Sequence, residues 1–407
     1  MLFEILHSNL VSVRHLASVI GKLNATMLAV SSAPLHYRGL QMLSAGFLRG
    51  GSYESECSLN TETRTELAWW LRNLNICKGR SLLPKPLVLI IETDASNWGW
   101  GAFSKDFSIG GPWFKSFKAK HINILELTAV FWALKALARN YSNATIKLKM
   151  DNISAITAIN KLGSPRSPQL TAVAQDLWTW AMDRDLTIVA EHIPGTENCL
   201  ADAASRGRLF DSGDWKLDTA VFDRLGSVFG KFSMDLFAAC HNCQIYPFFS
   251  WKPDPDAIAF DALTQAWKGG LLYAFPPFSL IAQCLTKLRN SDHPQEIVLI
   301  APVWPSQAWF PLQWSASTVF PVLLPQYDQL IVNPAKEPHP LMIDRSMRLA
   351  AWKLSTPSIT TRSFQKLLPS WLGPPGNPLL PSNMIYAGEN GANGHMSNIL
   401  TLFRSLP

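Results

Sequence analysis

The spacing of hydrophobic residues predicts a helical first part of the chain. VRHLASVIGKLNATMLAV, residues 13–30, places its apolar residues at helical intervals with polar residues between them. LHYRGLQMLSAGFL (35–48) and NTETRTELAWWLRNLN (60–75) show the same spacing. The third of these helices is expected to begin at a cap, Asn60 or Thr61. We therefore expect a helical segment over residues 1–85.

Residues 86–207 change to a pattern of strands and helices. PLVLII (86–91) is a continuous apolar run, which predicts a central strand buried on both faces. TIKLKM (145–150) alternates apolar and polar residues, which predicts a strand with Ile146, Leu148 and Met150 inward. HINILELTAVFWALKALARN (121–140) is apolar nearly all round, as is typical of a buried helix. The predicted order is strand, strand, strand, helix, strand, helix, helix, strand, helix.

The last part of the chain shows a second pattern of strands and helices, followed by a stretch without regular hydrophobic spacing. Residues 208–230 are expected to be a linker, and residues 231–335 a second α/β domain. FSMDLFA, GGLLYAF and EIVLIAPV have the composition of strands in that domain, and LIAQCLTKLRN that of a helix. Residues 336–407 are rich in Pro, Gly, Ser and Asn, which predicts an irregular C-terminal tail.

Composition narrows the class of protein. The 407 residues are enough for two or three domains, and a hydrophobic fraction of 47% is that of a globular chain. A formal net charge of +6 is compatible with nucleic acid as a partner, although many globular proteins without such a partner are as basic. No apolar run approaches the ~18 residues of a membrane span, so no membrane partner is expected.

Cysteine usage favours a reducing, intracellular compartment without distinguishing cytoplasm from nucleus. Six cysteines in a chain of this length do not make a disulfide framework. The one close pair, Cys240 and Cys243, lacks the second pair that a structural zinc site needs.

Four acidic residues stand at the ends of the predicted elements, and each has an ordinary structural explanation. Asp94 can simply end its strand, and Glu126 can form a capping box with Asn123. Asp151 and Asn152 can be an N-cap pair for the next helix. Asp202 can be an exposed carboxylate in the first turn of the last helix, where the helix dipole stabilises its charge.

Taken together, Asp94, Glu126, Asp151 and Asp202 predict a metal site. Two follow strands that we expect to be neighbours, and two begin helices that we expect to pack on that sheet. Unpaired carboxylates brought together would repel one another, and divalent cations remove that repulsion. Oxygen ligands without Cys or His suit Mg²⁺ or Mn²⁺. Two such ions about 4 Å apart activate a water and stabilise the leaving oxygen of a phosphodiester.

These motifs resemble the type 1 RNase H domain of reverse transcriptases. The residues are TDAS (93–96), LEL (125–127), MDN (150–152) and HIPGTENCLADAASR (192–206), the last similar to the ending in gypsy-like and DIRS-type retroelements. The resemblance implies an RNase H fold with a five-stranded mixed sheet. It also implies cleavage of the RNA strand of RNA–DNA hybrids with two Mg²⁺ or Mn²⁺ ions. By the same resemblance, Asp94, Glu126, Asp151 and Asp202 are the catalytic metal ligands.

The sequence departs from that family in two ways. Many type 1 enzymes have a histidine directly after the last-motif glycine, where this chain has Thr196 after Gly195. His192 lies earlier, on the predicted strand, and does not take that role. The basic helix-loop of some cellular enzymes is also absent, because KLGSPRSP (161–168) is short.

The first segment resembles the thumb and connection of DIRS-type retrotransposon polymerases. VRHLASVIGKLNAT, APLHYRGLQ and TELAWWLRNL carry this resemblance. It implies that the chain is a fragment of a retroelement polyprotein, with the polymerase part as a partner. The polymerase palm has no counterpart here, so we expect no polymerisation by these residues.

Residues 233–310 resemble phage-type adenine amino-group DNA methyltransferases. In active members the catalytic tetrapeptide begins with Asp or Asn, which accepts a hydrogen bond from the target amine. Here the tetrapeptide is Phe275-Pro276-Pro277-Phe278, and phenylalanine cannot accept that bond. We therefore expect a methyltransferase-like fold without methylation, with Asp235 as a candidate contact to S-adenosylmethionine.

Three functions follow from the sequence. The first is an endoribonuclease acting on RNA–DNA hybrids, which the four intact carboxylates favour. The second is a non-catalytic nucleic-acid-binding remnant of a retroelement, which the departures at Thr196 and Phe275 favour. The third is a DNA adenine methyltransferase.

Overall fold

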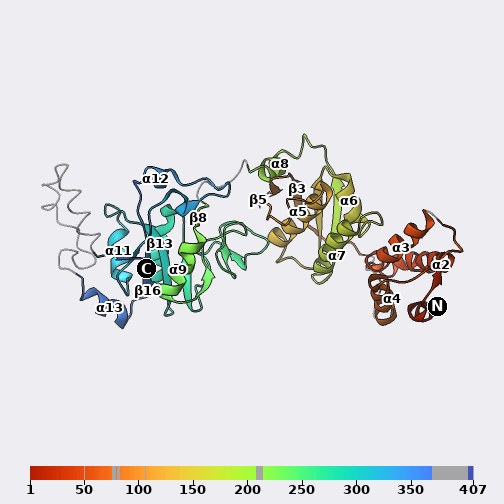
Figure 1. The fold of residues 1–407 in the computed structure, drawn as a ribbon, viewed down its shortest axis with the longest axis horizontal. Helices are drawn as coiled ribbons and strands as arrows, with labels where there is room; N and C mark the ends of the chain where they lie inside the picture. The colour runs from red at the N-terminus through yellow and green to blue at the C-terminus, as the bar shows by residue number, and fades with distance from the viewer. Residues whose placement is uncertain are drawn as a thin grey trace. The chain divides into compact units, whose positions relative to one another are not determined.

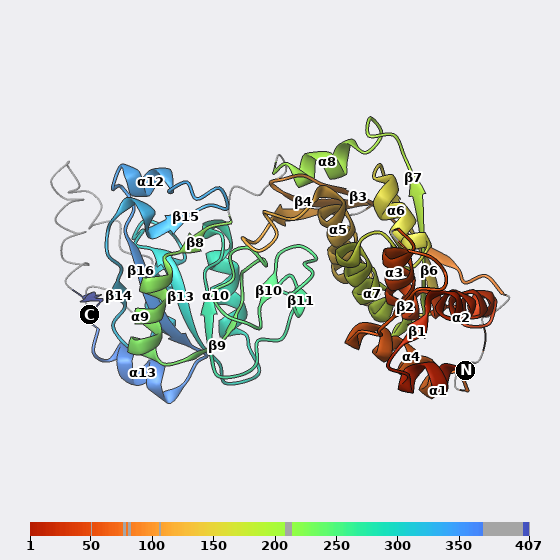
Figure 2. The same ribbon diagram turned by 45° about the vertical axis from the view of Figure 1, so that its right-hand side comes forward.

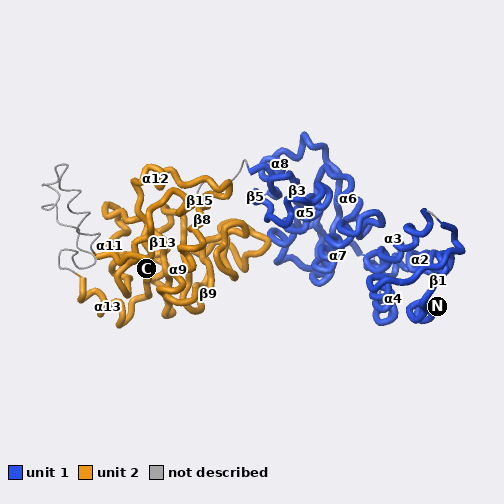
Figure 3. The backbone as a smooth tube through the Cα atoms, viewed as in Figure 1, with its two compact units in different colours: residues 1–209 blue, residues 210–407 orange. Residues whose placement is uncertain are grey.

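The computed structural model describes residues 1–49, 51–75, 79, 83–105, 107–207, 214–368 and 402–406 (Figure 1). The chain forms two compact units, residues 1–209 and 210–407 (Figure 3). Within the described residues, no helix has the length and apolar composition needed to cross a membrane.

The first unit begins with the three predicted helices and a further short helix before them, around a small core. They are α1 (Leu2–His7), α2 (Val13–Ala25), α3 (Arg38–Leu48) and α4 (Thr61–Asn73), with 3-10 turns η1 (Thr26–Leu28) and η2 (Ala33–His36) and a strand pair β1 (Val11–Ser12) and β2 (Glu56–Cys57). The Asn60 side chain accepts a hydrogen bond from the Thr63 amide at 2.8 Å, which makes Asn60 the cap of α4. Leu16, Leu67 and Trp70 are fully buried between these helices.

Residues 87–205 form a five-stranded mixed sheet with helices, in the predicted order. The strands are β3 (Leu87–Ala95), β4 (Gly99–Ser104), β5 (Phe107–Pro112), β6 (Ala144–Met150) and β7 (Leu186–His192). The helices are α5 (Ile122–Leu137), α6 (Ile153–Asn160), α7 (Pro168–Met182) and α8 (Cys199–Ser205). Strand order is β5-β4-β3-β6-β7, antiparallel from β5 to β3 and parallel from β3 to β7. This is an RNase H-like fold, as expected.

The core lies on one face of that sheet. Ile146, Leu148 and Met150 are fully buried, which confirms the inward face predicted for β6, and they pack with α5, α6 and α7. β3 is central, but the prediction that it is buried on both faces is wrong, because Val88 and Ile90 are 38% and 42% exposed. On the opposite face, α8 packs on β3, β4 and β5. It lies over the end of β3 near Asp94, which pairs with Gly101 beneath the helix, so Val88 and Ile90 near the start of β3 stay uncovered.

A glycine permits α8 to approach the sheet. A Cβ at Gly101 on β4 would lie 2.3 Å from the Ala201 carbonyl oxygen and 2.4 Å from the Ser205 amide nitrogen. Both atoms belong to the α8 backbone, so rotation of a side chain cannot relieve the contact. Gly101 thus sets the position of the helix that carries Asp202.

Replacing Gly101 with alanine is expected to destabilise the first unit by about 2 kcal/mol, in the range found for overpacked interiors. Denaturant-induced unfolding, monitored by hydrogen exchange of peptides from β4 and α8, measures the effect. The matched control is Gly21→Ala in α2, where a Cβ meets nothing within 4 Å and alanine should stabilise the helix slightly. Equal stability of the two variants would show that α8 does not pack this closely.

The helical segment packs against the α/β part of the first unit. Leu35 is buried in the core of the sheet, and its carbonyl oxygen accepts a 3.0 Å hydrogen bond from the Gln175 side chain on α7. The buried Arg38 guanidinium donates to the Lys161 carbonyl oxygen, just after α6. The expected segment 1–85 and domain 86–207 therefore share contacts within one unit.

The second unit is a six-stranded sheet between two layers of helices. Its strands are β9 (Phe232–Asp235), β12 (Leu271–Ala274), β13 (Glu296–Pro302), β14 (Val322–Leu323), β16 (Leu349–Ser355) and β17 (Arg404–Ser405), in the order β17-β14-β16-β13-β12-β9. Its helices are α9 (Thr219–Phe229), α10 (Ile281–Arg289), α11 (Phe310–Ala316), α12 (Pro340–Ile343) and α13 (Ile359–Gln365). Figure 2 shows α9 in front of the sheet; α9 packs on one face, and α10 and α11 pack on the other. The predicted strands and helix of 231–335 are confirmed.

Small elements complete this unit. They are the pairs β10 (Phe249–Ser250) with β11 (Ala259–Phe260) and β8 (Lys216–Leu217) with β15 (Ile331–Val332), and the turns η3 (Phe278–Leu280) and η4 (Asp328–Leu330).

Two expectations about the second unit are wrong. Residues 219–229 form helix α9 instead of a linker, with Val221 and Leu225 in the core, while 208–213 lie outside the described residues. Residues 349–355 form strand β16 instead of an irregular tail, and Trp352 is fully buried. β16 pairs along its whole length with β13, a partner distant in sequence that local composition does not reveal. Residues 369–401 of the expected tail lie outside the described residues.

Candidate metal centre

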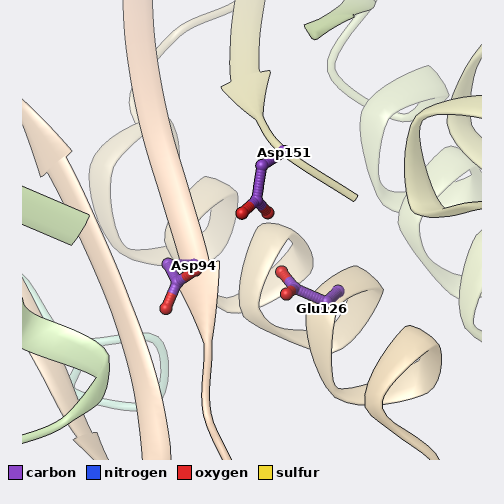
Figure 4. Close-up of side chains that lie close together, drawn as sticks. All are labelled: Asp94, Glu126 and Asp151. Carbon is purple, nitrogen blue, oxygen red and sulfur yellow. The ribbon is translucent and has the colours of Figure 1, made fainter. Parts of the chain in front are cut away.

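Parallel pairing of β3 with β6 brings two of the predicted ligands to the same edge of the sheet. Glu92 of β3 lies opposite Lys149 of β6, so Asp94 and Asp151 each follow two residues later at the same end. Asp94 belongs to β3, and Asp151 comes directly after the last residue of β6 (Figure 4). The expectation that their strands are neighbours is confirmed.

Glu126 reaches the same edge from α5, which packs on β3. The alternative of a capping box is wrong, because His121 caps α5 and its Nδ1 accepts from the Asn123 amide at 3.2 Å. Glu126 is 4% exposed, and its Oε2 has no hydrogen-bond partner among the described residues. A buried carboxylate oxygen without a donor is costly unless a cation binds it.

Asp151 is also free of the capping role considered for it. The side chain of Asn152, not that of Asp151, accepts from the Ala155 amide at 3.0 Å and caps α6. Asp151 is only partly buried and points toward the other two carboxylates (Figure 4).

Three carboxylates therefore converge. One oxygen each from Asp94, Glu126 and Asp151 lies within 4.8 Å of the others. Burial first, and then the charges of Asp94 and Asp151, raise the pKa of Glu126 to about 9, although a hydrogen bond from the Ala95 backbone amide lowers it. Burial likewise raises the pKa of Asp94 to about 6, against a hydrogen bond from Ser205. Burial and neighbouring charges thus favour the neutral forms of Asp94 and Glu126 unless a cation is present.

Asp202 lies outside this group of three. It sits in the first turn of α8, and its Oδ1 accepts a 2.6 Å hydrogen bond from Arg206 Nε in a partly exposed ion pair. Its charge still contributes to the raised pKa of Asp94, so it is near the cluster. The structure thus brings together three of the four predicted ligands.

Hydrogen bonds from the last motif hold Asp94 in place. The buried Ser205 hydroxyl donates to Asp94 Oδ2 at 2.5 Å, and Ser96 Oγ donates to the Ser205 carbonyl oxygen at 2.7 Å. Nδ2 of the buried Asn198 side chain donates to the Thr93 carbonyl oxygen at 2.9 Å. Sequence reasoning assigned no role to Ser205, Ser96 or Asn198, although all three lie in the quoted motifs, because only the fold shows their partners.

The loop after β7 borders the cluster. A Cβ at Gly195 would lie 3.2 Å from Asp151 Oδ2, which places the Gly195-Thr196 backbone beside that carboxylate. Thr196 is exposed there. His192 is exposed at the end of β7.

The second unit places its tetrapeptide directly after β12. A cavity of 220 Å³ is lined by Trp215, Phe275, Pro276, Pro277, Phe278 and Ser279. Asp235 at the end of β9 is 2% exposed, and burial raises its pKa to about 7. Its two oxygens accept from the Phe237 and Gln244 amides, each at 3.2 Å. The Asp235 carboxylate therefore binds backbone N–H groups, and too little of it is exposed to contact S-adenosylmethionine.

Comparison with known proteins gives one family and several structures. Residues 208–321 match the family of DNA N-6-adenine-methyltransferases (Dam), which is less than a third of the chain and too little to assign the chain to that family. No curated protein matches the sequence.

The solved structures that are similar include RNase H enzymes and a reverse transcriptase. RNase H1 of Halobacterium salinarum NRC-1 is 22% identical with a TM-score of 0.25, over 30% of this chain and 96% of that one. The RNase H domain of rv2228c from Mycobacterium tuberculosis is 18% identical with a TM-score of 0.25, over 29% and 96%. A foamy viral protease-reverse transcriptase in complex with RNA/DNA hybrid is 17% identical with a TM-score of 0.20, over 45% and 25%. Likeness at this level says nothing about substrate or reaction.

Proposed function

We propose that the RNase H-like part of the first unit, residues 86–207, hydrolyses the RNA strand of RNA–DNA hybrids with two Mg²⁺ or Mn²⁺ ions. One observation carries the proposal: Asp94, Glu126 and Asp151 converge within 4.8 Å at the sheet edge, two of them buried. Such a group is unfavourable for folding, and it has the ligand chemistry that hard divalent cations prefer.

The residues present fit that pair of ions. Asp94, Glu126 and Asp151 would hold them, and Asp202 is proposed as a fourth ligand once it leaves Arg206. When bound, the ions would activate a water and stabilise the leaving oxygen of the phosphodiester. Ser205 keeps the Asp94 carboxylate oriented, and the Gly195-Thr196 backbone borders Asp151. Preference for the RNA strand rests on the resemblance of the four motifs to type 1 RNase H.

We also propose that the chain derives from a retroelement. The resemblance of residues 1–85 to a thumb and connection supports a retroelement polyprotein with a polymerase part as partner. Contacts of Leu35 and Arg38 with the α/β part of the unit are compatible with a segment that positions the nuclease.

Methyl transfer by the second unit is not part of the proposal, despite the matched family. The side chain of Phe275 has no atom that accepts a hydrogen bond from an adenine amine. Both Asp235 oxygens already accept from backbone amides.

The purified chain is expected to shorten the RNA strand of a labelled RNA–DNA hybrid in Mg²⁺ and to leave the DNA strand whole. Denaturing electrophoresis with each strand labelled in turn measures this, with EDTA and a DNA duplex as controls. Well-folded protein that binds the hybrid with ordinary salt dependence, but cleaves neither strand, would support the non-catalytic remnant instead.

A further inference from the structure

A basic turn lies between β5 and α5. Residues 113–121, WFKSFKAKH, contain Lys115, Lys118 and Lys120, all exposed, and no acidic residue occurs between 107 and 125. No ion pair in the described part of the chain involves these three lysines. Their ammonium groups are therefore available to an external anion.

The first half of the basic turn is fixed to the strand that carries Asp94. Trp113 is 3% exposed, and its Nε1 donates to the Ser96 carbonyl oxygen at 2.8 Å. Its amide donates to the Trp98 carbonyl oxygen at 3.1 Å. Ser96 is the second residue after Asp94, so this anchor lies at the same sheet edge as the cluster.

Aromatic packing and internal hydrogen bonds give the turn a defined shape. The Phe117 ring lies 5.7 Å from that of Trp113 and 5.3 Å from that of Trp132 on α5. The amide of Phe117 donates to the Phe114 carbonyl oxygen, and the amide of Lys120 to that of Phe117, both at 2.9 Å. The lysines thus project from a supported backbone.

The second half of the turn is joined to the elements that carry the other two acids. His121 caps α5, the helix of Glu126. Two residues on, Asn123 Oδ1 accepts a 3.1 Å hydrogen bond from Asn152 Nδ2, and Asn152 directly follows Asp151. The basic turn therefore contacts the residue that follows β3 and continues into α5, and α5 in turn contacts the residue beside Asp151.

We propose that Lys115, Lys118 and Lys120 bind phosphates of an RNA–DNA hybrid beside the one that is cleaved. A cluster of carboxylates repels a polyanion, so cations next to it are needed to hold the duplex. The basic helix-loop of some related enzymes is absent, because only residues 161–167 separate α6 from α7. The inference rests on the proposed function for its choice of duplex, while the binding itself is measured without cleavage.

The test is hybrid binding by the full-length chain carrying Asp151→Asn, so that no cleavage intervenes. Adding Lys115→Gln, Lys118→Gln and Lys120→Gln should weaken binding by roughly 10²-fold near 0.1 M salt. The slope of log affinity against log salt should fall by about 2 to 3, one unit or slightly less for each lost phosphate contact. Fluorescence anisotropy of a labelled hybrid at several salt concentrations gives both values.

Two further triple variants separate a local site from net charge. Lys231→Gln, Lys268→Gln and Lys366→Gln remove the same charge from exposed positions of the second unit and should leave binding nearly unchanged. Arginine at 115, 118 and 120 keeps the charge and should keep the binding. Equal weakening by both glutamine triples, or retained binding by the first, would overturn the proposal.

The outcomes also separate this inference from the proposed nuclease. Cleavage by the wild-type chain, together with binding indifferent to the three lysines, would refute the basic turn alone. Lysine-dependent hybrid binding without any cleavage would refute the nuclease alone. Lysine dependence seen with a DNA duplex but not with the hybrid would exclude the hybrid as the ligand of the basic turn.

Discussion

Replacing Asp151 with asparagine is expected to lower hybrid cleavage by roughly 10³-fold. The change removes one negative charge and one hard oxygen ligand from three that lie within 4.8 Å, while keeping the shape of the side chain. Loss of a single charge-stabilising group in an active site typically costs ~10²–10³ in rate, and weaker metal binding adds to that cost. Single-turnover cleavage of the labelled hybrid at saturating Mg²⁺ measures the effect.

Asp176→Asn is the matched control for that experiment. Asp176 is exposed on α7, so the same chemical change there should leave the rate within about twofold, as for other surface substitutions away from special features. Cleavage by the Asp151→Asn protein at the rate of the control would remove Asp151 from the site. In EDTA, where no ion stabilises the wild type, both variants should unfold at the temperature of the wild type or above it, since neither loses a packing contact.

Without divalent ions, the stability of the first unit is expected to fall as pH rises from about 5 to 9. Burial and neighbouring charges raise the pKa of Glu126 from 4.5 to about 9, so the folded state holds a proton that the unfolded state has lost. A group of this kind lowers the free energy of unfolding by at most ~1.4 kcal/mol per pH unit across that window. Glu126→Gln removes the titration and should flatten the slope, giving up to ~4 kcal/mol more stability at pH 8.

Hydrogen exchange of peptides from β3 and β6 in EDTA, as a function of pH, reports that stability for the first unit alone. Excess Mg²⁺ should stabilise the wild type more than Glu126→Gln, because the ions offset the repulsion that the substitution has already removed. Asp176→Asn again serves as the control and should keep the wild-type slope. A wild-type slope equal to that of Glu126→Gln would mean that Glu126 is not buried against other acids.

Local patterns were sufficient to predict much of the first unit. The alternation in TIKLKM predicts the inward face of β6, and the order of the elements follows from period and turn residues. The convergence of Asp94 with Asp151 follows from strands that were expected to be neighbours, and the parallel pairing of β3 with β6 is what places both residues at one end. The prediction that β3 is buried on both faces was wrong, because an apolar run does not show how much of the strand a helix on the other face covers.

Side-chain partners and distant pairings were not predictable from local sequence. Nothing in the last motif shows that Asp202 pairs with Arg206, or that Ser205 donates to Asp94, since both depend on where α8 docks. In the second unit, LAAWKLS is a short apolar piece among prolines, and only its pairing with β13 makes it a core strand.

The central claim is that Asp94, Glu126 and Asp151 hold divalent ions for phosphodiester hydrolysis. Anomalous diffraction from crystals of the full chain grown with Mn²⁺ tests it most directly, with Mn²⁺ standing in for Mg²⁺. Peaks in contact with carboxylate oxygens of all three residues, lost in crystals of Asp151→Asn, are the predicted result. Crystals that bind Mn²⁺ elsewhere, with no peak at this cluster, would contradict the claim.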